Sequence, residues 1–301
     1  MDWRKIVGLF VETFFGWTER KAPVFAAAIA YSTLFSLAPL LIISINLASL
    51  TINAATFETR LLQTIEEQVG PEVAQLTEEI LAARFTFQPS GTAALISVGL
   101  LLFGASGVFL QLRGALNAMW HIQARPASVP ETLFGVAKGY LISVVAALLL
   151  GLVPIVLLFA SAVVASLPAR TVETVYRNES LTTVIQLLAS PVAYFVLFAL
   201  VLKYLPQADA PWRVIWPGAL LSAIGYWIGS VVLGYYVQNT AIRSIYGAAG
   251  SALALLIWAY YSAYIFLYGA KFVYSVANAY GYPIVPDKET TFVHLRYDGE
   301  E

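Results

Sequence analysis

The sequence contains no cysteine and only two histidines among its 301 residues. Without thiols the chain can form neither disulfide bonds nor cysteine-ligated metal sites, and it has no cysteine nucleophile. Charged residues make up only 12% of the sequence, about half of the share that soluble globular domains carry. So little charge cannot cover the surface of a soluble protein of this size. Most of the chain is therefore expected to face lipid.

The sequence also lacks the motifs that carry most enzyme chemistry. It shows no glycine-rich phosphate loop, no Walker A lysine, no HExxH helix and no Ser–His–Asp set. Acidic residues cluster within 58–79, and His121 stands beside Trp120 without a partner motif, as an interfacial histidine would. The net charge of −1 disfavours nucleic acid as a partner. We therefore expect that the protein is not an enzyme and that it binds no cofactor, metal ion or nucleic acid.

Apolar residues are abundant, at 59% of the chain, with a mean hydropathy of +0.74. Charged residues divide the sequence into six long uncharged stretches, each longer than the roughly 20 residues that a membrane-spanning helix needs. This pattern predicts an all-α integral membrane protein with six transmembrane helices. The predicted spans cover about 24–50, 91–112, 135–166, 181–203, 214–238 and 246–270.

The transmembrane domain is predicted over 22–275; two further segments flank it, and a third lies within it. Residues 1–21 predict an interfacial N-terminal helix, and because Glu12 interrupts its apolar run, no cleavable signal peptide is expected. Residues 57–84 predict two short amphipathic helices on the outer side, separated at Gly70-Pro71, or alternatively a solvated loop. The polar tail, 276–301, is predicted to be cytoplasmic and disordered or loosely docked from 283 onward.

The loop charges predict the orientation. With the N-terminus inside, twelve of the 17 lysines and arginines fall on the cytoplasmic side. Because cytoplasmic loops carry the excess of basic residues, this predicts that both termini lie in the cytoplasm. The sequence sets no oligomeric state.

Three predicted spans contain a proline near their middle: Pro39, Pro154 and Pro191. Proline frees a backbone carbonyl that must find a partner in hydrocarbon, so the kinks predict a cavity between helices, as in transporters. Proline is, however, common in membrane helices in general. The polar, tyrosine and proline positions that would line a substrate path are Ser32, Ser36, Pro39, Asn46, Gln111, Asn117, Tyr260, Tyr261 and Tyr264. The tyrosines alternatively hydrogen-bond to neighbouring helices.

Four basic residues stand at the cytoplasmic ends of predicted spans: Arg113, Lys203, Arg213 and Lys271. They predict either contacts with lipid headgroups in general or a site that gathers an anionic headgroup at the mouth of a cavity. No carboxylate stands inside a span to carry protons. Passive or lipid-gradient-driven movement is therefore the simpler expectation.

Four stretches resemble the YihY/BrkB family of bacterial inner-membrane proteins. They are "AAAIAYSTLFSLAPLL" (26–41), "LFGASGVFLQLRGALNAMW" (102–120), "YLPQADAPWRVIWPGALLSAIGYW" (204–227) and "IYGAAGSALALLIWAYYSAYIFLYGAKF" (245–272). The resemblance implies six helices with both termini cytoplasmic. It also implies a location in the bacterial inner membrane. Members of the family have been linked to virulence, to serum resistance and to export of lipid or lipid-like molecules, and some carry an old "ribonuclease BN" label that is widely regarded as mistaken.

The chain departs from that family at one position. Members commonly read Gly-Ala-Glu at the end of the sixth helix, where this sequence reads Gly269-Ala270-Lys271. If the acid carries protons or a cation in the family, this chain cannot do so in the same way. If the acid only anchors the helix, a lysine that snorkels to the interface serves equally well. We favour anchoring.

Together these features predict a transporter or flippase-like exporter of a lipid or other amphipathic, anionic substrate, with membrane lipids as its partners. The alternative is a membrane scaffold that docks partners through the acidic outer helices or the tail. A ribonuclease is a remote alternative, because no catalytic constellation is present.

Overall fold

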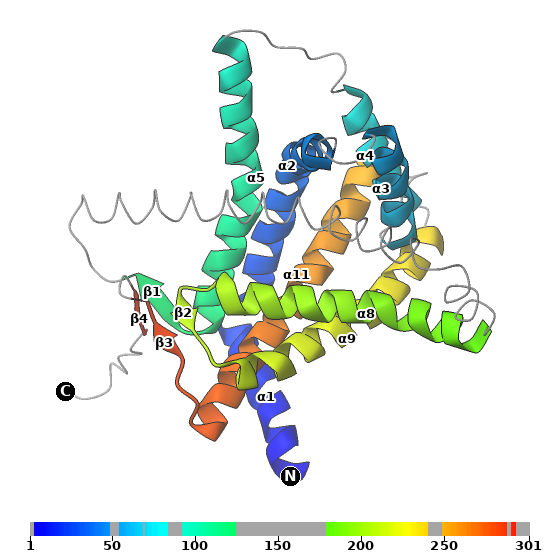
Figure 1. The fold of residues 1–301 in the computed structure, drawn as a ribbon. Coiled ribbons are helices and arrows are strands. Elements are labelled where there is room, and N and C mark those ends of the chain that lie inside the picture. Colours follow the sequence, from blue (N-terminus) through cyan, green and yellow to red (C-terminus); the bar gives the residue numbers. More distant parts are fainter. Residues whose placement is uncertain are drawn as a thin grey trace, which may run out of the picture.

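The computed structural model describes residues 3–48, 54–68, 70–83, 92–124, 179–239, 249–287 and 290–292. Within these ranges the fold is helical, with four very short strands (Figure 1). The helices are α1 (Trp3–Glu19), α2 (Ala22–Ala48), α3 (Ala54–Gln68), α4 (Pro71–Ala83), α5 (Thr92–Met119), α8 (Glu179–Tyr204), α9 (Trp212–Asn239) and α11 (Gly250–Tyr280). The strands are β1 (Ile122–Ala124), β2 (Ala208–Asp209), β3 (Val285–Pro286) and β4 (Thr290–Phe292).

Helix α11 is the centre of the fold. It packs against α9 and α2 along much of its length, and also against α1, α4 and α5. Figure 1 shows α2 and α5 on one side of α11 and much of α9 on the other, with α8 running across the front of these helices. Residues of α11 that would be exposed in an isolated helix are therefore buried among several neighbours, including Leu267, Ala270 and Val273.

Small residues allow α9 and α11 to approach closely. A Cβ atom added to Gly218 of α9 would lie only 2.7 Å from the carbonyl oxygen of Gly269 on α11. A Cβ atom on Gly225 would lie 2.8 Å from the side chain of Ile265. Only glycine fits such a backbone approach, which is typical of helix pairs in membranes.

The chain bends sharply between α1 and α2, which meet at 64°. Lys21 adopts a left-handed φ of 56°, and Pro23 then stands in the first turn of α2, where a missing N–H is tolerated. This bend fixes the position of Arg20 between the two helices.

The predicted pair of amphipathic helices is present as α3 and α4. Gly70, with a φ of 114°, breaks the chain immediately before Pro71 begins α4. Phe57 of α3 and Leu81 of α4 are buried against Leu41 and Ile45 of α2. These helices therefore cover one end of the bundle, and the alternative of a solvated loop is wrong.

The C-terminal segment is docked by two antiparallel strand pairs. β4 pairs with β1, placing Ile122 opposite Phe292, and β3 pairs with β2, placing Ala208 opposite Pro286. Gln207 joins the segment to α5, since its backbone N–H and side chain bond to Asn117 at 2.9 and 2.8 Å. Of the two predicted alternatives, a disordered or a docked tail, residues 283–287 and 290–292 follow the docked one. The all-α prediction missed these strands because each has only two or three residues.

The described helices occupy five of the six predicted spans, and the sixth range, 135–166, lies outside the described residues with Pro154. Within the described part, residues 212–233 and 250–280 are long and apolar enough to cross a membrane, and the bent pair 7–19 and 22–38 passes if it forms one span. Helix α11 continues to Tyr280, beyond the predicted end of the transmembrane domain, where Gly281 ends it in a left-handed conformation.

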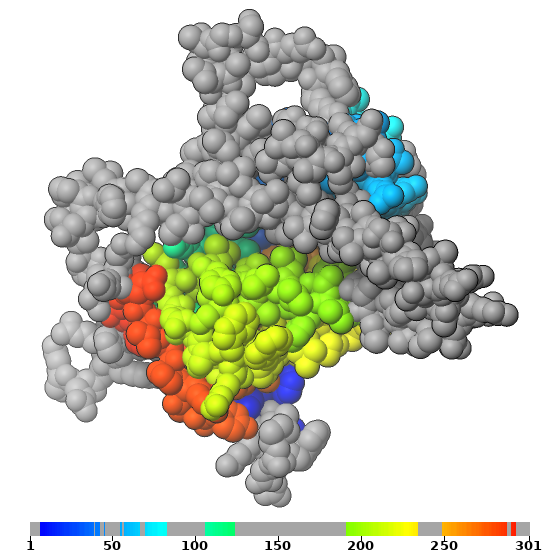
Figure 2. Space-filling model, in the orientation of Figure 1, coloured from blue at the N-terminus to red at the C-terminus, as the bar shows by residue number. Residues whose placement is uncertain are grey.

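Figure 2 shows parts of α8 and α9 together on one face of the molecule, and both helices expose many apolar side chains. These side chains include Val192, Val196, Leu200, Trp216, Leu220, Ile224, Ile228, Val231 and Val232. So many exposed apolar side chains on two packed helices fit contact with lipid.

Candidate functional site

Three basic side chains meet beside the end of α5, and we call Arg20, His121 and Lys271 the basic centre. Nη2 of Arg20 lies 2.5 Å from Nδ1 of His121. On the other side of the same ring, Nζ of Lys271 lies 2.7 Å from Nε2. The imidazole therefore bridges the α1–α2 bend and the central helix α11.

The turn after α5 holds His121 in place. His121 has a left-handed φ of 59°, which is uncommon for a residue other than glycine. The preceding Trp120 is fully buried, and its indole N–H donates a 2.9 Å hydrogen bond to the carbonyl oxygen of Ala270. Because Ala270 precedes Lys271, this anchor sets the imidazole and the lysine side by side.

Lys271 is only 4% exposed, so its side chain does not reach the bundle surface. The expectation that it snorkels to the interface is wrong. Its methylene stem passes directly over Gly16 of α1, where an added Cβ would lie 2.5 Å from Cε. Its Nζ atom lies 4.4 Å from the ring centre of Tyr274. That ring also stacks on His121, with centroids 4.5 Å apart and planes inclined by 7°.

The basic centre has an excess of positive groups. Glu12 and Glu19 of α1 act on Lys271 at longer range, but no carboxylate in the described ranges pairs with Lys271 or Arg20 within 4.0 Å. The pKa of His121 is lowered from 6.5 to about 3, first by burial and then by the positive charges of Lys271 and Arg20. The imidazole is therefore neutral at physiological pH.

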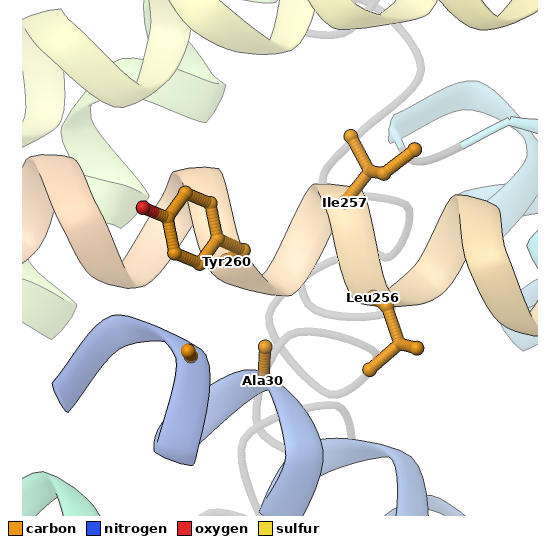
Figure 3. A pocket seen from close by; sticks show the side chains of 5 residues that line it. Ala30, Leu256, Ile257 and Tyr260 are labelled. Carbon is orange, nitrogen blue, oxygen red and sulfur yellow. The ribbon is translucent and has the colours of Figure 1, made fainter. Parts of the chain in front are cut away.

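An apolar groove of about 290 Å³ lies between α2 and α11 (Figure 3). It is lined by Ala27, Ala30, Leu256, Ile257 and Tyr260. Figure 3 shows Leu256, Ile257 and Tyr260 on α11, with Ala30 facing them from α2. The small alanine side chains leave the space that the groove occupies.

Aromatic rings connect the groove to the region of the basic centre. Tyr260 stacks on Tyr264, with ring centroids 5.6 Å apart. Trp17 of α1 lies 4.0 Å from the Tyr264 ring and 5.3 Å from that of Tyr268. Tyr268 in turn donates a 3.2 Å hydrogen bond to the backbone of Phe10. These rings pack α1 onto α11 on the side of α11 that faces α2.

The structure brings together only some of the predicted path residues. Tyr260 lines the groove and Tyr264 adjoins it, whereas Tyr261 packs over Gly229 of α9. Ser36 is buried next to Gly107 of α5, and Ser32 is half-buried on the same helix.

The remaining path residues do not line the groove or are not described. Gln111 is exposed, and Asn117 is engaged with Gln207. The side chains of Pro39 and Asn46 lie outside the described residues, although the helical range of α2 includes both positions.

The four predicted headgroup residues have different environments. Lys203 forms an ion pair with Asp209 and donates a 2.8 Å hydrogen bond to the carbonyl oxygen of Ala210. Arg213 is exposed and Arg113 is half-buried. Only Lys271 belongs to the basic centre, and its partners there are Arg20 and His121. Sequence reasoning missed both partners because they lie far from Lys271 along the chain.

Within the described ranges, no group of three or more histidine, aspartate and glutamate side chains could hold a metal ion.

Sequence comparison shows which known proteins the chain resembles. The sequence model of the virulence factor BrkB family matches residues 13–292. A UPF0761 membrane protein from Teredinibacter turnerae is 25% identical over 89% of this chain and 60% of its own length. Another, from Alteromonas mediterranea, is 24% identical over 92% of this chain and 89% of its own.

A shorter match covers 27% of this chain and 30% of a putative ribonuclease-like protein, YfkH, from Bacillus subtilis, at 30% identity. The chain spans only 54–60% of the length of several of the membrane proteins it resembles. No solved structure matches it. Because the family model covers most of the sequence, the chain belongs to the BrkB virulence factor family of membrane proteins.

Proposed function

We propose that this chain crosses the bacterial inner membrane six times, with both termini in the cytoplasm, and moves an amphipathic, anionic, lipid-like molecule. The single observation that supports the proposal best is the alignment of the apolar groove and the basic centre on one face of α11. A lipid-like anion needs both an apolar and a cationic surface, at a fixed separation.

Helix geometry gives this alignment. Tyr260 and Lys271 are 11 residues apart in α11. At about 100° and 1.5 Å per residue, they lie within about 20° of one another around the axis and about 16 Å apart along it. Tyr264 lies between them on the same stripe. The side facing α2 therefore presents the groove at one level and the basic centre at another.

The two surfaces match the two parts of such a molecule. Alanine, leucine and isoleucine side chains in the groove provide contacts for hydrocarbon without burying a polar group. Under the predicted orientation, the basic centre lies at the cytoplasmic end of the spans, where the anionic headgroups of the inner leaflet lie. A lipid whose headgroup is bound there would direct its hydrocarbon chains toward the groove.

Native mass spectrometry of the gently extracted full chain tests the proposal. We expect anionic lipids to remain bound in excess of their share of the membrane extract, and the excess to disappear in Lys271→Gln. Arg213→Gln is the matched control, because it removes one exposed positive charge and should keep the excess. Retention in membrane proportions would contradict the proposal and favour a scaffold that docks protein partners.

A further inference from the structure

The hydrogen bonds of the basic centre leave one donor without a suitable acceptor. Arginine stays protonated in proteins, so the short contact from Arg20 requires a lone pair on Nδ1 of His121. A neutral imidazole carries its proton on the other nitrogen, so Nε2–H points at Nζ of Lys271, 2.7 Å away. If Lys271 is protonated, two donors face each other.

Among the residues that the structure describes, none supplies an acceptor that would resolve this conflict. Within the described ranges, Nζ of Lys271 contacts the face of the Tyr274 ring in addition to His121. Neither Glu12 nor Glu19 forms an ion pair with Lys271. Lys271 is only 4% exposed, so water does not serve as an alternative acceptor for its amine. A buried charge without an acceptor is costly, whereas an anion within reach of several N–H donors is strongly held.

We infer that the basic centre binds a phosphate-type oxyanion. Arg20 has further guanidinium N–H groups beyond the one directed at His121, and Lys271 has three when protonated. Arg20 and His121 are half-buried, so an anion can approach from their side while Lys271 closes the buried side. The lipid form of this inference rests on the proposed function, because the same oxyanion chemistry is found in a lipid headgroup and in free phosphate.

Binding of the anion favours the protonated state of Lys271, which takes up a proton from water if it was neutral. The charged and titratable groups that face this amine are Glu12, Glu19, Arg20, His121 and Tyr274. Sulfate keeps its charge between pH 6 and 9, so any pH dependence of sulfate affinity in that range reports on the protein.

The test measures ligand binding to the purified full chain in a non-ionic detergent, without any transport step. The probes are sodium sulfate, inorganic phosphate and dioctanoyl phosphatidate, with dioctanoyl phosphatidylcholine as the zwitterionic control. The variants are Lys271→Glu, Arg20→Gln and the exposed-charge control Arg213→Gln. Lys271→Glu is informative because the carboxylate can accept from Nε2–H of His121 and attracts the nearby charge of Arg20, so the protein should remain folded while the amine is lost.

We expect wild type and Arg213→Gln to bind at least one phosphate-type probe, and Lys271→Glu and Arg20→Gln to bind it at least tenfold more weakly. Binding of phosphatidate alone identifies a lipid headgroup as the ligand. If sulfate or phosphate binds and phosphatidate does not, the result supports the anion site and contradicts the lipid function. Binding of no probe, or equal weakening in Arg213→Gln, overturns the site. If Lys271→Glu does not fold, Arg20→Gln decides between these outcomes.

Discussion

Nζ of Lys271 lies 2.7 Å from Nε2 of His121, although the two residues are 150 positions apart in the sequence. The contact joins the central helix α11 to the turn after α5. The amine thus occupies a position at which an acceptor would satisfy Nε2–H of His121.

Lys271→Glu should therefore stabilise the protein. The carboxylate would accept a hydrogen bond from Nε2–H of His121, and a bond to a charged group contributes about 1.5–3 kcal/mol. Because glutamate is shorter than lysine, we expect a gain of about 1–2 kcal/mol in the free energy of unfolding, measured by denaturation in detergent. The same substitution at Lys203 should destabilise, since it places a carboxylate beside Asp209. A loss of stability in Lys271→Glu would show that the lysine is satisfied as it stands.

The low pKa of His121 predicts a pH-dependent stability. The pKa is about 3 in the folded protein, against 6.5 in the unfolded chain, so between these values the unfolded chain binds more protons. Stability must then fall as the pH drops from about 7 toward 3. The window from pH 7 to 5 is the most diagnostic, because few carboxylates titrate there. His121→Gln should flatten the fall in thermal unfolding temperature across that window; an unchanged slope would contradict the assignment.

Gly218→Ala should weaken the contact between α9 and α11. The new methyl group would meet Val273 and the carbonyl oxygen of Gly269, neither of which is a freely mobile end of a side chain. Overpacking of this kind costs about 1–3 kcal/mol, which unfolding measurements in detergent can resolve. Gly114→Ala is the matched control, since nothing lies within 4 Å of its added Cβ. It should be neutral or stabilise by up to about 1 kcal/mol.

Asn117→Ala should loosen the docked C-terminal segment. It removes both hydrogen bonds to Gln207, whose carbonyl oxygen accepts bonds from the backbone of Asp287 and the hydroxyl of Thr290. We expect a loss of about 1–2 kcal/mol and faster amide exchange at residues 285–292. Gln111→Ala, on the exposed face of the same helix, should leave both readouts unchanged. Equal exchange in the two variants would show that the segment does not depend on this clasp.

Long uncharged stretches were sufficient to predict helices at five of six ranges, and Gly70-Pro71 marked the break between α3 and α4. These signals are local: charge ends a span, and glycine followed by proline ends a helix. The basic centre was not predictable in this way. It depends on the bend at Lys21, on the left-handed turn at His121 and on the close passage of Lys271 over Gly16, and none of these contacts leaves a periodic pattern.

The predicted path residues illustrate the same limit. Tyr260 and Tyr261 are neighbours in the sequence, yet one lines the groove and the other packs on Gly229. Adjacent residues in a helix point about 100° apart, so composition cannot say which of them faces a cavity. The packing partners of α11 decide this, and they come from distant parts of the chain.

The measurement that tests the central claim most directly is lipid flux in vesicles that contain the purified chain. The probes are fluorescent phosphatidate and fluorescent phosphatidylcholine, and external quenching reports how much lipid crosses. We predict that phosphatidate crosses faster in vesicles with wild type or Arg213→Gln than in empty vesicles. Crossing should be slower than with wild type in vesicles with Lys271→Gln or with Ala27→Leu, which fills the groove. Crossing no faster than in empty vesicles, or crossing that neither substitution slows, would contradict the account.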